Sequence, residues 1–294
     1  MRTSLLGLLL LALLIPTCKE DPDPQGANPA VEQDGWSLSF AEEPEVKAGE
    51  VPAWCAKKGY TCVLGNPLYS FLAEGKLHLV AKPGPVHERR IRLALTDREK
   101  LRSGLESKVL IQFTPSDFAL DPVKFPRVRI RMAPVTLPGK GADLRDSNKN
   151  DACFYLLLGF GDPIHEFGGV KLPDTLAYVW ADQKWEGEVA SDPDYREFLR
   201  YVMVGSGDAD PGKIREITRN VAEDFRKAFP ECFAAARDAR EGEGANGASG
   251  VEKRTGEPKV PPLRSVSVMV DANTVESKSE SVLESIQFLP PEKQ

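Results

Sequence analysis

The run Phe154-Tyr155-Leu156-Leu157-Leu158 decides the fold class of this 294-residue chain. Its side chains are all large and largely apolar, so a strand built from it has no solvent-facing side. We therefore expect it at the centre of a sheet that is covered on both faces. The chain also carries 24 glycines and 24 prolines, and this frequency of turn residues favours many short strands over long helices.

Working outward, strand-like runs recur along the chain with turn residues between them. One pair of runs flanks Glu74-Gly75 and is typical of a hairpin, while the run near residue 90 alternates charged and apolar side chains, as a half-buried strand does. The predicted strands are Trp36–Phe40, Tyr69–Leu72, Leu77–Val80, Arg89–Leu95, Val109–Phe113, Val128–Met132, Phe154–Phe160, Leu176–Trp180, Phe198–Val204, Leu263–Val270 and Val282–Phe288.

One segment, residues 221–229, predicts a helix. Asn220 followed by Glu223 is a suitable arrangement for capping its N-terminus, and its apolar residues fall on one face. After it, residues 238–259 are rich in Gly, Glu and Lys and are expected to form a mobile loop. Many short strands with one inserted short helix indicate a mainly β fold, a jelly-roll-type β-sandwich.

The N-terminus has the organisation of an export signal. Met1-Arg2 precedes an apolar run from Leu5 to Ile15, which is too short to cross a bilayer and is followed by Cys18 and a polar, acidic stretch. The pattern resembles a bacterial lipoprotein signal, in which Cys18 becomes the lipid-bearing N-terminus. The alternative is an ordinary secretion signal with Cys18 beside its cleavage site.

This interpretation divides the chain into a signal peptide (1–17), a flexible tether (18–34) and a single β-sandwich domain (35–294). The expected location is the bacterial cell envelope, with a lipid anchor holding the protein to a membrane. The net charge of −6 argues against nucleic acid as a partner, because phosphate binding needs a basic face.

Four further cysteines are present, and an even number in an exported protein suggests disulfides. Cys55 and Cys62 could close a small loop, which would leave Cys153 and Cys232 to pair. Cys153 lies in an apolar strand and could equally be a buried free thiol. Zinc spacing is absent around all four cysteines.

From about residue 125 to 288 the chain resembles a bacterial family, the domain of unknown function 3047. The resemblance rests on the order and spacing of several short pieces. They are Lys124–Arg129, Asn150–Ala152, Leu176–Trp180, Val204–Gly207, Arg219–Phe229, Val268–Thr274 and Ser285–Phe288. The family pattern is similar to galactose-binding-like jelly rolls, which include carbohydrate-binding modules. The resemblance thus implies a sandwich fold, but fold alone does not establish function.

The best-matched pieces supply candidate ligand-binding residues. Arg219, Asp224, Asp271 and Asn273 could recognise sugar hydroxyls or a carboxylate through bidentate hydrogen bonds. The alternative is a structural ion pair that fixes the helix to a sheet edge. Trp185 follows a predicted strand and is the aromatic residue best placed to stack on a sugar ring, whereas aromatic residues within strands are expected to fill the core.

One loop concentrates oxygen ligands. Asp143, Asp146, Asn148, Asn150 and Asp151 could hold a structural calcium ion, which takes six to eight oxygens. The alternative is an ordinary solvated turn, because Asp and Asn are common turn residues. No other cofactor is expected.

Catalytic motifs are missing from the sequence. The three histidines, His78, His87 and His165, lack metal-binding spacing, and no nucleophile elbow is found. We therefore expect a non-enzymatic envelope protein that binds a glycan or another envelope component. The alternatives are a structural lipoprotein that contacts a protein partner, and a carbohydrate hydrolase that uses an Asp/Glu pair.

Overall fold

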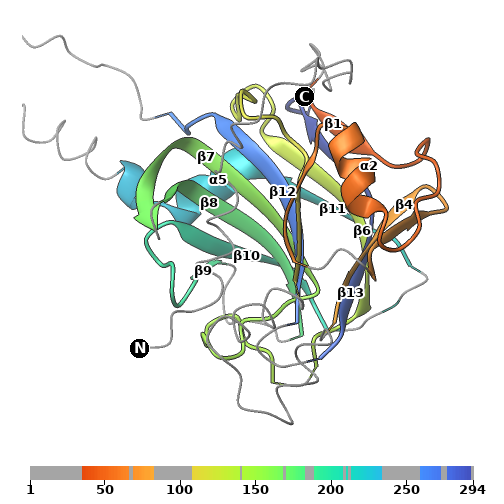
Figure 1. Ribbon diagram of the computed structural model, residues 1–294. Helices are drawn as coiled ribbons and strands as arrows, with labels where there is room; N and C mark the ends of the chain where they lie inside the picture. Colours follow the sequence, from red (N-terminus) through yellow and green to blue (C-terminus); the bar gives the residue numbers. More distant parts are fainter. Residues whose placement is uncertain are drawn as a thin grey trace, which may run out of the picture.

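The computed structural model describes residues 35–65, 69–82, 108–139, 141–167, 170–182, 189–207, 210, 213–233, 259–272 and 277–292. Within these residues the chain forms two β-sheets that pack against each other (Figure 1). Some sequence predictions lie outside the described residues. They concern the signal and tether with Cys18, the strand Arg89–Leu95, Trp185, Asn273 and nearly all of the loop 238–259.

The larger sheet has seven strands in the order β2-β5-β12-β7-β8-β10-β9. Its central strand is β7, which begins with the apolar run at Phe154, as the sequence predicts. Neighbouring strands are antiparallel, except that β8 and β10 run parallel. The bounds are β2 Thr61–Gly65, β5 Lys108–Gln112, β7 Phe154–Phe167, β8 Val170–Ala181, β9 Val189–Ser191, β10 Leu199–Ser206 and β12 Leu263–Asp271.

The smaller sheet has six strands in the order β11-β6-β13-β4-β3, and β1 pairs with β13 beside this path. Alternation sets its two faces. In β6, for example, Val128, Ile130 and Met132 are buried, while Arg129 and Arg131 point to the other side. The bounds are β1 Ser37–Ser39, β3 Phe71–Ala73, β4 Lys76–Ala81, β6 Arg127–Thr136, β11 Arg215–Asn220 and β13 Ser279–Leu289.

The predicted hairpin at Glu74-Gly75 is confirmed. Strands β3 and β4 are antiparallel, and Ala73 pairs with Lys76 across a two-residue turn. Both turn residues have positive φ, 52° at Glu74 and 68° at Gly75, which matches the primed turn that fits the twist of paired strands.

The predicted helix is present as α5 (Val221–Ala228). The Asn220 side chain accepts a hydrogen bond from the backbone N–H of Glu223 at 3.2 Å. The prediction of a single helix was wrong, because α2 (Val51–Lys57) is a second one. Its signal was short but readable, since Val51, Trp54 and Cys55 share one buried face.

Strands β2, β9 and β11 were also missed. β9 has three residues, and β11 (Arg215–Asn220) contains a single large apolar residue, Ile217. Such segments join a sheet because their neighbours offer backbone partners, which periodicity does not reveal. None of the helices in the described parts of the chain has both the length and the apolarity needed to traverse a bilayer.

The core explains why the central run is apolar on both faces. Phe154, Leu156 and Leu158 point between the two sheets, and Tyr155 and Leu157 point to the outer face of the seven-stranded sheet. A second apolar cluster covers part of that outer face with side chains from the connecting loops, among them Leu144, Tyr195 and Phe198. The rest of this outer face carries the groove described next.

Candidate functional site

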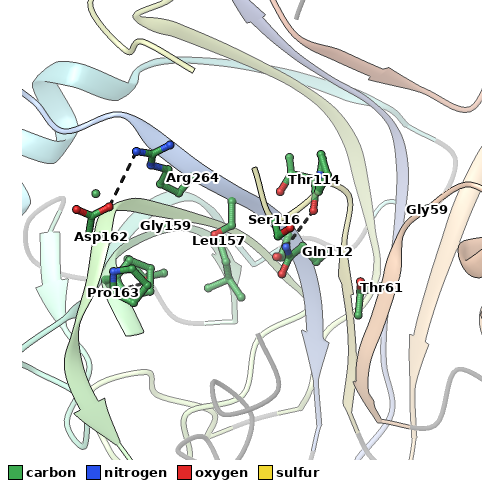
Figure 2. Close-up of a pocket in the computed structure, with 16 residues that line it drawn as sticks. Gly59, Thr61, Gln112, Thr114, Ser116, Leu157, Gly159, Asp162, Pro163 and Arg264 are labelled. Carbon is green, nitrogen blue, oxygen red and sulfur yellow. Dashed lines mark hydrogen bonds and ion pairs between the residues drawn. The ribbon is translucent and has the colours of Figure 1, made fainter. Parts of the chain in front are cut away.

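A groove of about 540 Å³ lies on the outer face of the seven-stranded sheet. Five adjacent strands form its floor, from edge strand β2 to β8. Figure 2 shows the residues that line the groove, among them Thr61, Gln112, Leu157 and Gly159. The strand register arranges the floor in two rows of side chains. The first row is Thr61, Gln112, Ser267 and Leu157, and the second is Ser265, Gly159 and Thr175. The threonine, serine and glycine residues in these rows leave space open above the sheet.

The polar side chains that line the groove carry mainly hydroxyl and amide groups. Two of its hydroxyls are already engaged: Thr114 Oγ1 accepts from the Val266 N–H at 3.1 Å, and Thr175 Oγ1 donates to the Pro173 carbonyl at 3.1 Å. The Gln112 amide donates to the Thr114 carbonyl at 3.0 Å. These bonds fix the orientation of the polar groups around the floor.

Ser267 differs from these residues. It is 1% exposed, and its hydroxyl has no hydrogen-bond partner among the described residues. A buried hydroxyl without a partner costs about 1–3 kcal/mol, and most buried polar groups are paired. Ser267 lines the groove, but its hydroxyl is shielded from solvent, so a ligand supplies the missing partner only when the neighbouring side chains move aside.

One end of the groove is formed by β7 and β8, close to the connection between these two strands, and by the start of β12. Arg264 and Asp162 face each other there at 4.0 Å, with side chains 42% and 88% exposed. Gly159 keeps the floor low, because a Cβ at that position would lie 2.4 Å from Ser265 Oγ. Leu157 and three prolines, Pro115, Pro163 and Pro173, add apolar surface.

The structure brings Arg219 and Asp224 together, although outside the groove. Arg219 donates from Nε and Nη2 to the two carboxylate oxygens of Asp224 at 2.9 and 2.8 Å, and Tyr178 Oη donates to the same carboxylate at 2.8 Å. Burial, and then the neighbouring Asp224, raises the pKa of Tyr178 well above its usual value, so the phenol stays a donor. The three groups connect β11, α5 and β8. This arrangement is the alternative given in the sequence analysis, a structural ion pair that fixes the helix to a sheet edge.

Asp271 does not join this pair. It lies at the end of β12 opposite Lys108 of β5, and the Lys108 Nζ is 2.5 Å from Asp271 Oδ2. The two side chains are 1% and 0% exposed. The sequence predicts Asp271 as a candidate ligand-binding residue, and the structure places it in an internal ion pair.

The acidic loop 143–151 is an internally bonded turn. Asp143 binds the Arg145 guanidinium, and Asp146 accepts from the backbone N–H of Asn148 at 2.9 Å. Asn150 and Asp151 are buried. Among the residues that the structure describes, no three His, Cys, Asp or Glu side chains are grouped so that they could hold a metal ion.

The four described cysteines are free thiols. Cys55 and Cys62 adjoin, with Sγ atoms 2.9 Å apart. Cys153 and Cys232 do not face each other, because Cys153 is buried against the Trp180 carbonyl at 3.3 Å and Cys232 lies 3.7 Å from Asp174. A disulfide between Cys153 and Cys232 does not fit this arrangement.

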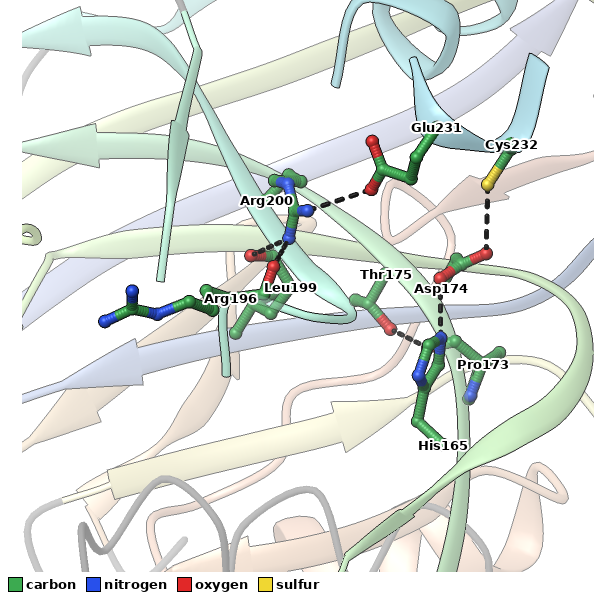
Figure 3. A network of polar contacts seen from close by, with 9 residues as sticks. All are labelled: His165, Pro173, Asp174, Thr175, Arg196, Leu199, Arg200, Glu231 and Cys232. Carbon is green, nitrogen blue, oxygen red and sulfur yellow. Dashed lines mark hydrogen bonds and ion pairs between the residues drawn. The ribbon is translucent and has the colours of Figure 1, made fainter. Parts of the chain in front are cut away.

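Asp174 is the centre of a second polar cluster (Figure 3). Its carboxylate contacts His165 Nε2 at 2.8 Å on one side and Cys232 Sγ on the other, and Arg200 binds Glu231 at 3.0 Å nearby. A nucleophilic cysteine needs a neighbouring base and a depressed pKa. Here burial and the Asp174 charge raise the pKa of Cys232 to about 11, so the arrangement does not favour a thiolate.

Sequence reasoning missed the groove. The signal was the alternation Ser265-Val266-Ser267-Val268 in β12, which gives a strand one apolar face and one face of small hydroxyls. The pairing of this strand with β5 and β7 brings Gln112 and Gly159 beside the two serines, and that pairing is not readable from the chain.

Comparison with models of protein families matches part of the chain. Residues 116–238 match the model of a family described as protein of unknown function (DUF3047). The family is the one that the sequence resembles, but the match ends before two of the pieces on which the resemblance rests, Val268–Thr274 and Ser285–Phe288. The match spans β6 to α5 and includes the β7 and β8 parts of the groove. No curated protein and no solved structure matches the chain.

Proposed function

From the premise that residues 116–238 belong to the DUF3047 family, we propose that the protein is an exported, lipid-anchored and non-enzymatic binding protein that holds a glycan in the groove on its seven-stranded sheet. The family has no known function, so the proposal rests on the chemistry of the groove and on the N-terminal signal pattern. The observation that carries it is the row of polar side chains around the unpartnered Ser267 hydroxyl.

Groove chemistry suits a polyhydroxylated ligand. Hydroxyl and amide groups both donate and accept hydrogen bonds, as sugar hydroxyls do. The apolar surface of Leu157 and the three prolines matches the C–H faces of a sugar ring. Small-molecule sites commonly combine an apolar lining with a few fixed polar groups, in volumes of about 300–1,000 Å³.

As far as the structure describes it, the groove contains none of the ligand-binding residues that the sequence predicted. Arg219, Asp224 and Asp271 are engaged in internal ion pairs, so they are not part of this proposal. The described lining contains a single carboxylate, Asp162. A hydrolase of the usual type needs two carboxyl groups across the bound sugar, and the groove as described does not offer them.

A protein-contact role has less support. Three large apolar side chains are exposed among the described residues, Val123, Ile164 and Val189. They belong to the segment before β6, to β7 and to β9, so they come from three separate elements.

Binding to a panel of soluble peptidoglycan fragments and lipopolysaccharide-derived oligosaccharides tests the proposal. The full chain in detergent is titrated with each glycan by calorimetry. We expect one glycan class to bind, and Thr61→Trp to abolish binding, because Thr61 is exposed on edge strand β2 and a large ring there obstructs the groove.

Thr218→Trp is the matched control. Thr218 is an exposed threonine on β11, which is the edge strand of the other sheet. This variant is expected to bind as the native chain does. Absence of binding across the panel, or equal binding by both tryptophan variants, would contradict the proposal.

A further inference from the structure

Two thiols lie beside one wall of the groove. Cys55 is in α2 and Cys62 is in β2, and their Sγ atoms are 2.9 Å apart. This separation is shorter than a van der Waals contact between sulfur atoms and longer than a disulfide bond, which measures about 2.05 Å. The backbone therefore already holds the two side chains where a small movement would join them.

The turn between the two cysteines is closely packed. The Tyr60 N–H donates to the Cys55 carbonyl at 2.8 Å, and Gly59 has a φ of +72°. The Tyr60 ring contacts Trp54 at 5.5 Å and Phe113 at 5.2 Å between ring centroids. The approach of the two sulfur atoms thus follows from a fixed turn.

This turn also contributes to the groove. Gly59 and Thr61 lie between the two cysteines and line it. β2 is an edge strand that pairs only with β5 among the described strands, and an edge strand opens more easily than a central one.

We propose that Cys55 and Cys62 form a disulfide that fastens edge strand β2 to α2 and thereby fixes this wall of the groove. The fastening itself is independent of what the groove binds; only its effect on ligand binding rests on the proposed function. The reaction needs an oxidant that carries a disulfide, such as oxidised glutathione or a thiol oxidase of an oxidising compartment.

The surroundings of the two thiols determine which of them reacts with the oxidant first. Cys62 is half-buried, whereas Cys55 is 1% exposed. The hydrogen bond between the two thiols lowers the pKa of Cys62, while the same contact and then burial raise the pKa of Cys55 far above its usual value. Cys62 is therefore the thiolate that attacks first.

The Cys62 thiolate attacks one sulfur of the oxidant, forms a mixed disulfide and releases the other sulfur as a thiolate. Cys55 then gives its proton to that released thiolate and attacks Cys62 Sγ, which expels the second sulfur of the oxidant. Two protein thiols and one disulfide become one protein disulfide and two small thiols.

The test is disulfide mapping on the full chain. The protein is equilibrated with mixtures of reduced and oxidised glutathione, unfolded, alkylated and digested, and the peptides are identified by mass spectrometry. We expect the peptides of Cys55 and Cys62 to be joined and free of the alkyl group, whereas Cys153 and Cys232 are alkylated. Alkylation of both Cys55 and Cys62 at every glutathione ratio would overturn the proposal.

Hydrogen exchange measures the fastening itself. Oxidation is expected to slow the exchange of the β2 amides and to leave β9, the opposite edge strand of the same sheet, unchanged. The Cys62→Ser variant should show no response to oxidation in either strand. Equal exchange of β2 in the oxidised and reduced protein would contradict the claim that the disulfide fixes this strand.

The two proposals fail in different ways. A mapped disulfide with slower β2 exchange but no glycan binding rejects the proposed function and leaves the fastening intact. Glycan binding without a disulfide under any oxidising condition rejects the fastening and leaves the binding function intact.

Discussion

The Arg219 guanidinium holds the Asp224 carboxylate through two hydrogen bonds, from Nε at 2.9 Å and from Nη2 at 2.8 Å. Tyr178 Oη donates a third bond to the same carboxylate. Asp224 is buried, while a quarter of the Arg219 side chain reaches solvent. This contact joins helix α5 and edge strand β11 to strand β8 of the other sheet, so its role is structural.

Asp224→Ala should therefore destabilise the fold without affecting binding in the groove. The substitution leaves Arg219 and Tyr178 without their acceptor, and we expect unfolding to become easier by about 2–4 kcal/mol, because one side of the pair is partly solvated. Urea denaturation measures this change. Asp117→Ala, at an exposed aspartate, is the control and should stay within about 0.5 kcal/mol of the native chain.

The Lys108–Asp271 pair is more deeply buried. Lys108→Met leaves the Asp271 carboxylate without its cation, and we expect a loss of about 3–5 kcal/mol. The double variant Lys108→Met with Asp271→Leu should recover most of that loss, because two apolar side chains avoid the cost of burying charge. A double variant as unstable as the single one, measured by denaturation, would contradict this account.

His78 should make the stability depend on pH. Its ring stacks on Phe71 at a centroid distance of 4.2 Å, and burial lowers the pKa of His78 below its usual value of 6.5, although Glu280 opposes the shift. The unfolded chain then binds the proton more readily than the folded one. Stability from this residue is present above pH 6.5 and is lost as the pH falls from there toward the lower pKa of the folded state.

The measurement is the midpoint of urea unfolding at a series of pH values between 7.5 and 5, compared between the native chain and His78→Phe. The phenylalanine keeps a ring against Phe71 and removes the titrating group. We expect the curve of the variant to be flatter over this range. Curves of equal slope would show that His78 does not contribute to the pH dependence.

Most of the fold could be predicted from local patterns in the sequence. The double-sided apolar run at Phe154–Leu158, the Glu74-Gly75 turn and the Asn220 cap each depend on neighbours in sequence, and the structure contains all three. Strands β2 and β11 were missed, because their placement depends on pairing partners distant in the chain. Helix α2 was missed although its buried stripe is present in the sequence.

The candidate site was less predictable for the same reason. Arg219 and Asp224 are five residues apart, and their contact could be foreseen as a structural pair. The partner of Asp271 is Lys108, which only the β5–β12 register places opposite it. Likewise, three strands must align before Gln112, Ser267 and Gly159 share one surface, so a ligand site built on a sheet face is not readable from any one segment.

Two buried serines provide the most direct test of the groove. Ser267 and Ser281 are 1% and 0% exposed, and neither hydroxyl has a partner among the described residues. Ser267 lies in the groove, whereas Ser281 is in β13 of the other sheet. Replacing either serine with alanine removes an unpaired polar group, and we expect each variant to be more stable by about 1 kcal/mol.

The decisive measurement is the affinity of the native chain, Ser267→Ala and Ser281→Ala for the glycan that binds most tightly in the panel. The account predicts that Ser267→Ala weakens binding by about 3- to 10-fold, the worth of one hydrogen bond, while becoming more stable, and that Ser281→Ala binds as the native chain does. Unchanged affinity in Ser267→Ala would contradict the central claim that this groove holds the ligand.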